Sequence, residues 1–123
     1  MAPAALRVLV VDDDPSIRLL CRVNLEAAGL VVDEAADGRS ALEAALASPP
    51  DVALLDVMMP GLDGWELAAK LRESEATAKV GVVFITAVTG EAARERAGSL
   101  GAVYVSKPFD PLELPSIVKR AAG

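Results

Sequence analysis

The stretch LLDVMMPGLDG, residues 54–64, joins the end of an apolar run to a segment rich in turn-forming residues. The apolar run that begins at Val52 and ends in the carboxylate of Asp56 has the length of a buried β-strand. A proline and two glycines follow within eight residues, and they indicate a loop. A carboxylate directly after a buried strand lies at the end of the sheet. The rest of the sequence indicates which groups it contacts there.

Four other apolar runs of about strand length accompany this one, and a helix-like segment follows each of the five. The runs cover residues 6–11, 30–32, 52–55, 80–85 and 103–105. After the first run, Ile17, Cys21 and Leu25 have helical spacing, and Gly29 is the expected helix stop. Runs one, three and four are apolar at nearly every position, as in strands buried on both faces. The alternation predicts one doubly wound α/β domain over residues 1–123, with a five-stranded parallel sheet.

The composition limits the classes of function. The chain has 123 residues, of which 53% are hydrophobic and 24% charged, a balance typical of a globular domain. The net charge of −6 argues against a nucleic-acid-binding surface. The longest uncharged run, residues 80–90, is too short to span a membrane, and MAPAALR is not a secretory signal. Because Cys21 is the single cysteine, no internal disulfide is possible, and we expect a cytoplasmic protein.

Helix capping accounts for several of the acidic residues. Asp14 is predicted to cap the first helix and Asp63 the third, because each stands directly before a helical pattern. Asp110 and Glu113 are predicted to form a capping arrangement at the fifth helix. Pro115 follows inside that helix, where we expect it to make the first turns irregular.

Asp12, Asp13 and Asp56 are left without a capping role, and each follows a core strand at its carboxyl end. If the first and third strands are neighbours, the three carboxylates converge in the crevice where open α/β sheets bind ligands. At about 4 to 5 Å, each like-charged pair would cost roughly 3 to 4 kcal/mol. Either proton uptake or a hard divalent cation would relieve this repulsion, and Mg²⁺ is the natural candidate. Zinc is not expected, because the chain has no histidine and one cysteine.

Two further polar residues are predicted at the same edge of the sheet. Thr86 ends the run GVVFIT, and Lys107 follows VYVS. Taken singly, each has an ordinary explanation, as a satisfied hydroxyl and a solvated charge. Together with three carboxylates and a metal ion, they are the groups needed to hold a phosphoryl group. Asp56 could then act as a nucleophile and form an aspartyl phosphate.

The motifs VVDDDP, LLDVMMPGLDG, FITA and YVSKPF, in that order and spacing, resemble the receiver domain of two-component response regulators over nearly the whole chain. The resemblance implies a flavodoxin-like (βα)5 fold with strand order 2-1-3-4-5, and a cis peptide before Pro108. It implies that Asp56 is the phosphoacceptor and that Asp13 and Asp56 bind Mg²⁺ directly. Asp12 would bind the metal through water, and Met58 would add a backbone carbonyl.

By the same resemblance, Thr86 and Lys107 would bind the phosphoryl oxygens, and Tyr104 would act with Thr86 as a switch. The switched face would comprise the fourth helix, the fifth strand and the fifth helix. The implied partners are a sensor histidine kinase or a histidine phosphotransfer protein, a downstream effector, and a second copy in a phosphorylation-dependent homodimer. Such a domain is regulatory, although it assists its own phosphoryl transfer and dephosphorylation.

Two alternatives remain open from the sequence. A phosphohydrolase of the haloacid dehalogenase type also uses an Asp nucleophile and Mg²⁺. Asp12 and Asp14 form its D-x-D pattern, although Pro15 follows and a lid domain does not fit the length. A pseudo-receiver would have the same fold and act by binding alone. A receiver of this kind either stands alone and acts through protein contacts, or forms the front of a longer regulator.

Overall fold

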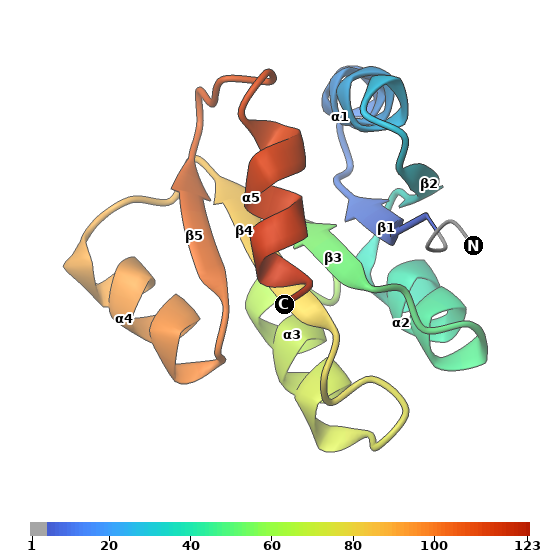
Figure 1. Ribbon diagram of the computed structural model, residues 1–123. Coiled ribbons are helices and arrows are strands. Elements are labelled where there is room, and N and C mark those ends of the chain that lie inside the picture. The colour runs from blue at the N-terminus through green and yellow to red at the C-terminus, as the bar shows by residue number, and fades with distance from the viewer. Residues whose placement is uncertain (1–4) are drawn as a thin grey trace.

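The computed structural model describes residues 5–123, and its centre is a sheet of five parallel strands in the order β2-β1-β3-β4-β5 (Figure 1). A helix follows each strand, so the predicted doubly wound α/β fold with strand order 2-1-3-4-5 is confirmed. The elements in chain order are β1 (Arg7–Val11), α1 (Pro15–Ala27), β2 (Val31–Ala35), α2 (Gly38–Ala47), β3 (Val52–Leu55), α3 (Gly64–Glu73), β4 (Gly81–Thr86), α4 (Glu91–Ser99), β5 (Val103–Ser106) and α5 (Leu114–Ala121).

The second strand is the one that the apolar pattern located least well. The sequence predicts residues 30–32, whereas β2 continues through two acidic residues to Ala35. β2 lies at the edge of the sheet and pairs with β1. Only part of an edge strand has to be buried, and in β2 the buried residues are Val32 and Ala35. The apolar run therefore ends before the strand does.

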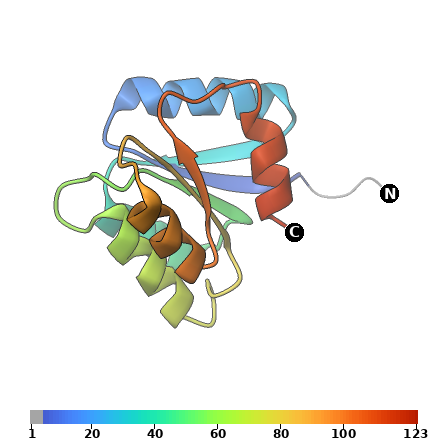
Figure 2. The same ribbon diagram turned by 90° about the vertical axis from the view of Figure 1, so that its left-hand side faces the viewer.

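Helices cover both faces of the sheet (Figure 2). On one face, Cys21 of α1 and Val118 of α5 are buried against the strands. On the other face, α2, α3 and α4 contribute to a second cluster, in which Trp65 packs on Phe84 with ring centroids 4.6 Å apart. This arrangement leaves the carboxyl ends of the strands as the open edge of the molecule. Within residues 5–123, none of the helices has the length and apolar character required to cross a membrane.

Three helices begin at aspartate caps. Asp14 caps α1 as predicted, and Asp63 caps α3 in a capping box with Glu66. α2 has a cap that the sequence did not reveal, because the Asp37 carboxylate accepts a hydrogen bond from the Ser40 N–H at 2.8 Å. Gly29, the expected stop of the first helix, adopts a positive φ of 87°. Each cap satisfies backbone N–H groups that the helix itself leaves free.

The predicted capping arrangement at α5 is wrong. The Asp110 carboxylate accepts from the Leu112 N–H at 2.9 Å, and the Glu113 side chain makes no cap hydrogen bond. The helix starts only after Glu113, so that Pro115 lies in its first turn, where a missing N–H needs no partner. The sequence predicts irregular first turns in the fifth helix. In the structure, residues 111–113 form a turn, and the helix itself begins after them at Leu114.

Candidate functional site

The pairing of β1 with β3 brings the unassigned acids together. Val11 is paired with Leu55, so Asp12 and Asp56 follow two adjacent strand ends. One carboxylate oxygen each from Asp12, Asp13 and Asp56 lie within 4.8 Å of one another. Asp12 and Asp56 are buried and Asp13 is exposed. The predicted convergence of the three carboxylates is confirmed.

Lys107 provides the positive charge at this acidic cluster. Its Nζ lies 3.0 Å from a carboxylate oxygen of Asp12 and 3.3 Å from one of Asp56. Burial lowers the pKa of this ammonium group, but the two carboxylates outweigh burial and the net shift of the pKa is upward. From the sequence, a proton or a metal ion is the expected counter-charge. The ammonium group of Lys107 is a third source, which β5 brings to the cluster.

The Asp12 residue is fixed through both its side chain and its backbone. Burial is the main cause that raises the pKa of its carboxyl, and the nearby Asp56 charge adds to it. The Asp14 N–H, 2.9 Å from Asp12 Oδ1, and the Lys107 ammonium act in the opposite direction. Arg18 Nη1 donates to the Asp12 backbone carbonyl at 2.7 Å. A carboxylate held in place at an electrostatic cost is typical of a functional site.

Thr86 is the last residue of β4 and is fully buried. Its Oγ1 accepts a hydrogen bond from the Val88 N–H at 3.1 Å, and its carbonyl accepts from the Lys107 N–H at 2.9 Å. The hydroxyl proton of Thr86 is therefore still available to a further acceptor. Thr86 ends β4 and Lys107 directly follows β5, the neighbouring strand, so both lie at the same edge, as the sequence predicts.

Tyr104 is half-buried on β5 and donates its hydroxyl proton to the backbone carbonyl of Val88. The guanidinium of Arg94 stacks over the Tyr104 ring, 5.1 Å from the centroid. The backbone of Val88 is thus hydrogen-bonded to both predicted switch residues, Thr86 and Tyr104. No sequence motif predicts this connection, because the backbone of Val88 makes both hydrogen bonds.

Two loops border the acidic cluster. In the loop between β3 and α3, the Met58 N–H donates to Asp56 Oδ1 at 3.2 Å, and Met58 is 64% exposed. In the loop after β5, the peptide between Lys107 and Pro108 is cis, as the resemblance implies. Met58 and Lys107 therefore approach Asp56 from different loops.

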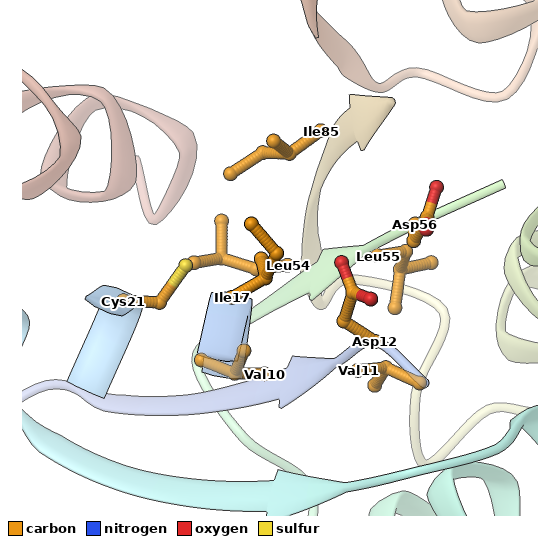
Figure 3. A pocket seen from close by; sticks show the side chains of 9 residues that line it. All are labelled: Val10, Val11, Asp12, Ile17, Cys21, Leu54, Leu55, Asp56 and Ile85. Atoms are coloured by element: carbon orange, nitrogen blue, oxygen red, sulfur yellow. The ribbon is translucent and has the colours of Figure 1, made fainter. Parts of the chain in front are cut away.

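A small pocket lies beside the acids, between α1 and the sheet (Figure 3). The carboxylates of Asp12 and Asp56 lie at one end of the pocket and Cys21 at the other. Its volume of about 10 Å³ leaves room for at most one water molecule. Burial raises the pKa of the Cys21 thiol to about 12, so this thiol stays protonated and is not a nucleophile at neutral pH. A group larger than a water molecule therefore has to approach Asp56 from the solvent side.

The sequence of the chain is similar to that of response regulators. The family described as the response regulator receiver domain matches residues 8–119. The DNA-binding dual master transcriptional regulator RpaA of Synechocystis sp. is 38% identical over 114 residues, which are 92% of this chain and 47% of RpaA. The transcriptional regulatory protein ResD of Bacillus subtilis is 40% identical over 114 residues, 92% of this chain and 46% of ResD. The chain thus spans about half the length of these relatives.

Solved structures share the fold over nearly the whole chain. The chemotaxis protein CheY4 of Vibrio cholerae has a TM-score of 0.89 and 34% identity, and the match covers 96% of this chain and 99% of that one. A putative response regulator from Chloroflexus aurantiacus has a TM-score of 0.90 and 32% identity, covering 97% of this chain and 98% of that one.

Proposed function

The chain belongs to the family of response regulator receiver domains, and on this premise we propose that Asp56 accepts a phosphoryl group from a phosphohistidine. The donor would be a sensor histidine kinase or a histidine phosphotransfer protein. The observation that carries the proposal is the cluster of Asp12, Asp13 and Asp56 with Lys107 bridging two of them. The cluster combines a carboxylate nucleophile with an ammonium group that can pair with phosphoryl oxygens.

Asp56 is proposed as the nucleophile because both of its carboxylate oxygens are oriented by neighbours. Oδ1 accepts from the Met58 N–H, and Oδ2 faces the Lys107 ammonium. A carboxylate oxygen attacks phosphorus, the bond between phosphorus and the histidine nitrogen breaks, and its electron pair stays on that nitrogen. The imidazole nitrogen then takes up a proton, so the products are an acyl phosphate on Asp56 and a neutral histidine.

Lys107 and Thr86 are proposed to hold the transferred group. The Lys107 ammonium can exchange a carboxylate contact for a phosphoryl oxygen, since it already spans Asp12 and Asp56. The Thr86 hydroxyl can donate its proton to a phosphoryl oxygen while it continues to accept from the Val88 N–H. Both groups then stabilise negative charge that the attack brings to the site.

The residues present fit a magnesium ion. Three carboxylates provide oxygen donors within 4.8 Å of one another, and oxygen is the donor that Mg²⁺ prefers. We propose Asp13, Asp56 and the backbone carbonyl of Met58 as its direct ligands, with Asp12 binding it through water. When bound, Mg²⁺ supplies positive charge that offsets the carboxylates and the phosphoryl oxygens.

The output is proposed to lie on the face formed by α4, β5 and α5. The backbone of Val88 supports this, because it is bonded both to Thr86 at the acidic edge and to Tyr104 on β5. A downstream effector, or a second copy of the chain, would bind this face in the cytoplasm. RpaA is described as DNA-binding, whereas the net charge of −6 argues that these 123 residues do not bind nucleic acid themselves.

Family membership argues against the alternative of a haloacid dehalogenase-type phosphohydrolase. The pseudo-receiver alternative makes a different prediction from ours, because a domain that acts by binding alone would not be phosphorylated. The grouping of Asp56, Thr86 and Lys107 at one edge favours the phosphorylated receiver.

Phosphorylation with a small donor tests the proposal. Incubation with acetyl phosphate and Mg²⁺ should add one phosphoryl group, seen as one mass shift in intact-protein mass spectrometry. Asp56→Asn should take up none, whereas the control Asp33→Asn, at an exposed residue of β2, should be labelled like the wild type. Removal of the metal with a chelator should prevent labelling. Equal labelling of Asp56→Asn would contradict the assignment.

A further inference from the structure

Gly64, the first residue of α3, packs against the peptide group of Asp56. Its N–H donates to the Val57 carbonyl at 3.0 Å, which closes the loop of residues 57–63. A Cβ atom at this position would lie less than 3.0 Å from three backbone atoms. These atoms are the Asp56 carbonyl oxygen, the Asp56 carbonyl carbon at 2.9 Å and Val57 Cα at 2.8 Å. Because Gly64 does not have a positive φ, an alanine here would be opposed by this contact and not by its backbone angles.

Both sides of this contact are anchored. On one side, α3 is held by the Asp63–Glu66 capping box and by the buried Trp65 and Leu67. On the other side, the Asp56 N–H donates to Val11 in the neighbouring strand at 2.9 Å. Side chains in a packed interior can change rotamer, but backbone atoms on two anchored elements cannot separate without moving one element. An added methyl group would therefore displace the peptide that joins Asp56 to Val57.

The displacement would reach the Asp56 carboxylate through short connections. The carboxylate is one side chain away from the displaced peptide, and its Oδ1 is bonded to the Met58 N–H within the same loop. Its Oδ2 lies 3.3 Å from Lys107 Nζ, which belongs to a different loop and would not move with it. A shift of the Asp56 backbone therefore changes the position of the nucleophile relative to Lys107. A misplacement of about 1 Å can reduce a reaction rate roughly 10²-fold.

We propose that Gly64 is a positioning residue for Asp56, whose missing side chain lets α3 close against the Asp56–Val57 peptide and sets the carboxylate in place for phosphoryl transfer. This inference rests on the proposed function of Asp56 as phosphoacceptor. Gly64 itself touches no reacting atom.

The chain offers two matched controls for the substitution Gly64→Ala. A Cβ on Gly81, at the opposite end of β4 from the acidic edge, would meet the Ala121 carbonyl at less than 3.0 Å. A Cβ on Gly38 would meet the Leu62 carbonyl equally closely. Leu62 belongs to the loop of residues 57–63, but it is six residues away from Asp56. Neither glycine has a positive φ. The three alanine variants thus introduce the same kind of clash, and only one of them is at the Asp56 peptide.

The experiment compares initial phosphorylation rates by acetyl phosphate at saturating Mg²⁺. Rates are expressed per folded molecule, with the folded fraction taken from urea unfolding in the same buffer. Gly64→Ala should be phosphorylated at least tenfold more slowly than wild type, while Gly81→Ala and Gly38→Ala should stay within about threefold. In metal-free protein, the amide resonance of Met58 should shift in Gly64→Ala and not in Gly81→Ala. This amide reports the Asp56 Oδ1 contact directly, and a loss of stability alone would not move it.

A Gly64→Ala rate within threefold of the Gly81→Ala rate would overturn the proposal. All variants are also studied at 10 °C in trimethylamine N-oxide, which favours the folded state. If Gly64→Ala alone stays unfolded there, Gly64 is needed for the fold as a whole and the positioning role is again overturned. Failure of the wild type to be labelled at Asp56 would instead refute the proposed function, and the Met58 amide would still test the placement of Asp56.

Discussion

Thr86 and Tyr104 are hydrogen-bonded to the same residue, Thr86 Oγ1 to the N–H of Val88 and the Tyr104 hydroxyl to its carbonyl. The first lies at the acidic edge of the sheet and the second on β5. A movement of Thr86 toward a phosphoryl group on Asp56 would therefore displace Val88, and with it the carbonyl that accepts the hydrogen bond from Tyr104. Such a connection lets a local event bias a two-state element at a distance.

Beryllofluoride, a mimic of the phosphoryl group, should reveal this connection in amide resonances. In the wild type we expect shifts at the acidic edge and also from residue 88 to residue 105. Thr86→Ala should lose the second group of shifts, because it cannot follow the phosphoryl group, whereas Thr86→Ser, which keeps the hydroxyl, should retain them. Shifts confined to the acidic edge in the wild type would show that Val88 does not transmit the change.

Asp12→Asn should stabilise the metal-free protein at neutral pH. The folded-state pKa of the Asp12 carboxyl is raised above its ordinary value of 3.8, chiefly by burial. A group of this kind favours the fold while it is protonated, below the unfolded pKa, and this contribution is lost as the pH rises through the folded pKa. Asparagine stays neutral, so the free energy of unfolding at pH 7 should rise by about 1 kcal/mol. Urea unfolding in the presence of a chelator measures it.

The gain from Asp12→Asn should shrink as the pH falls through the raised folded-state pKa, and it should be lost below 3.8, where the wild-type carboxyl is itself neutral in both states. Asp33→Asn is the control, because Asp33 is an exposed acid whose side chain is 61% accessible, and it should change stability by less than about 0.5 kcal/mol. Saturating Mg²⁺ should stabilise the wild type more than Asp12→Asn, since the metal binds the folded state. A destabilised Asp12→Asn at pH 7 would mean that the Lys107 ion pair outweighs burial.

The core strands and the acidic edge could be predicted from sequence because both depend on local order along the chain. A strand buried on both faces must be apolar throughout, which locates β3 within residues 52–55. The acids that follow such strands must meet where parallel strands end. The strand order, by contrast, came from the resemblance, since the apolar pattern does not say which strands are neighbours.

The contacts that sequence could not predict are those made across the fold by groups with several possible partners. Lys107 bridges Asp12 and Asp56 at separations of 95 and 51 residues, and no local pattern selects these partners. At α5, Asp110 and Glu113 have the spacing of a capping box, but Pro115 fits best in the first turn and the helix starts later. There the fixed φ of proline overrides the capping signal.

The arginines of α4 illustrate the same limit and lead to a prediction. As charged residues of a helix, Arg94 and Arg96 are expected on a solvated face, yet the Arg96 guanidinium stacks over Trp65 at 4.9 Å from the ring centroid. α4 buries only the small residues Ala93 and Ala97, so stacking of this kind adds to its attachment. Arg96→Ala should lower the free energy of unfolding by about 0.5 to 1 kcal/mol and change the fluorescence of Trp65. Glu95→Ala, an exposed control on the same helix, should change neither.

The lifetime of the acyl phosphate proposed on Asp56 should depend on Met58 and Val88, which stand two positions after Asp56 and Thr86. Hydrolysis needs a water molecule in line with phosphorus and opposite the Asp56 oxygen, and a polar side chain at either position can orient it. Two apolar side chains cannot, and the exposed Met58 and half-buried Val88 should shield the phosphoryl group instead. Met58→Asn combined with Val88→Glu should therefore accelerate phosphate loss, and a tenfold change requires only about 1.4 kcal/mol off the barrier.

The decay of phosphorylated protein after removal of acetyl phosphate measures this rate. Met58→Leu with Val88→Ile, which stays apolar, should decay like the wild type. Unchanged or slower decay in the polar double mutant would show that these side chains do not control access of water.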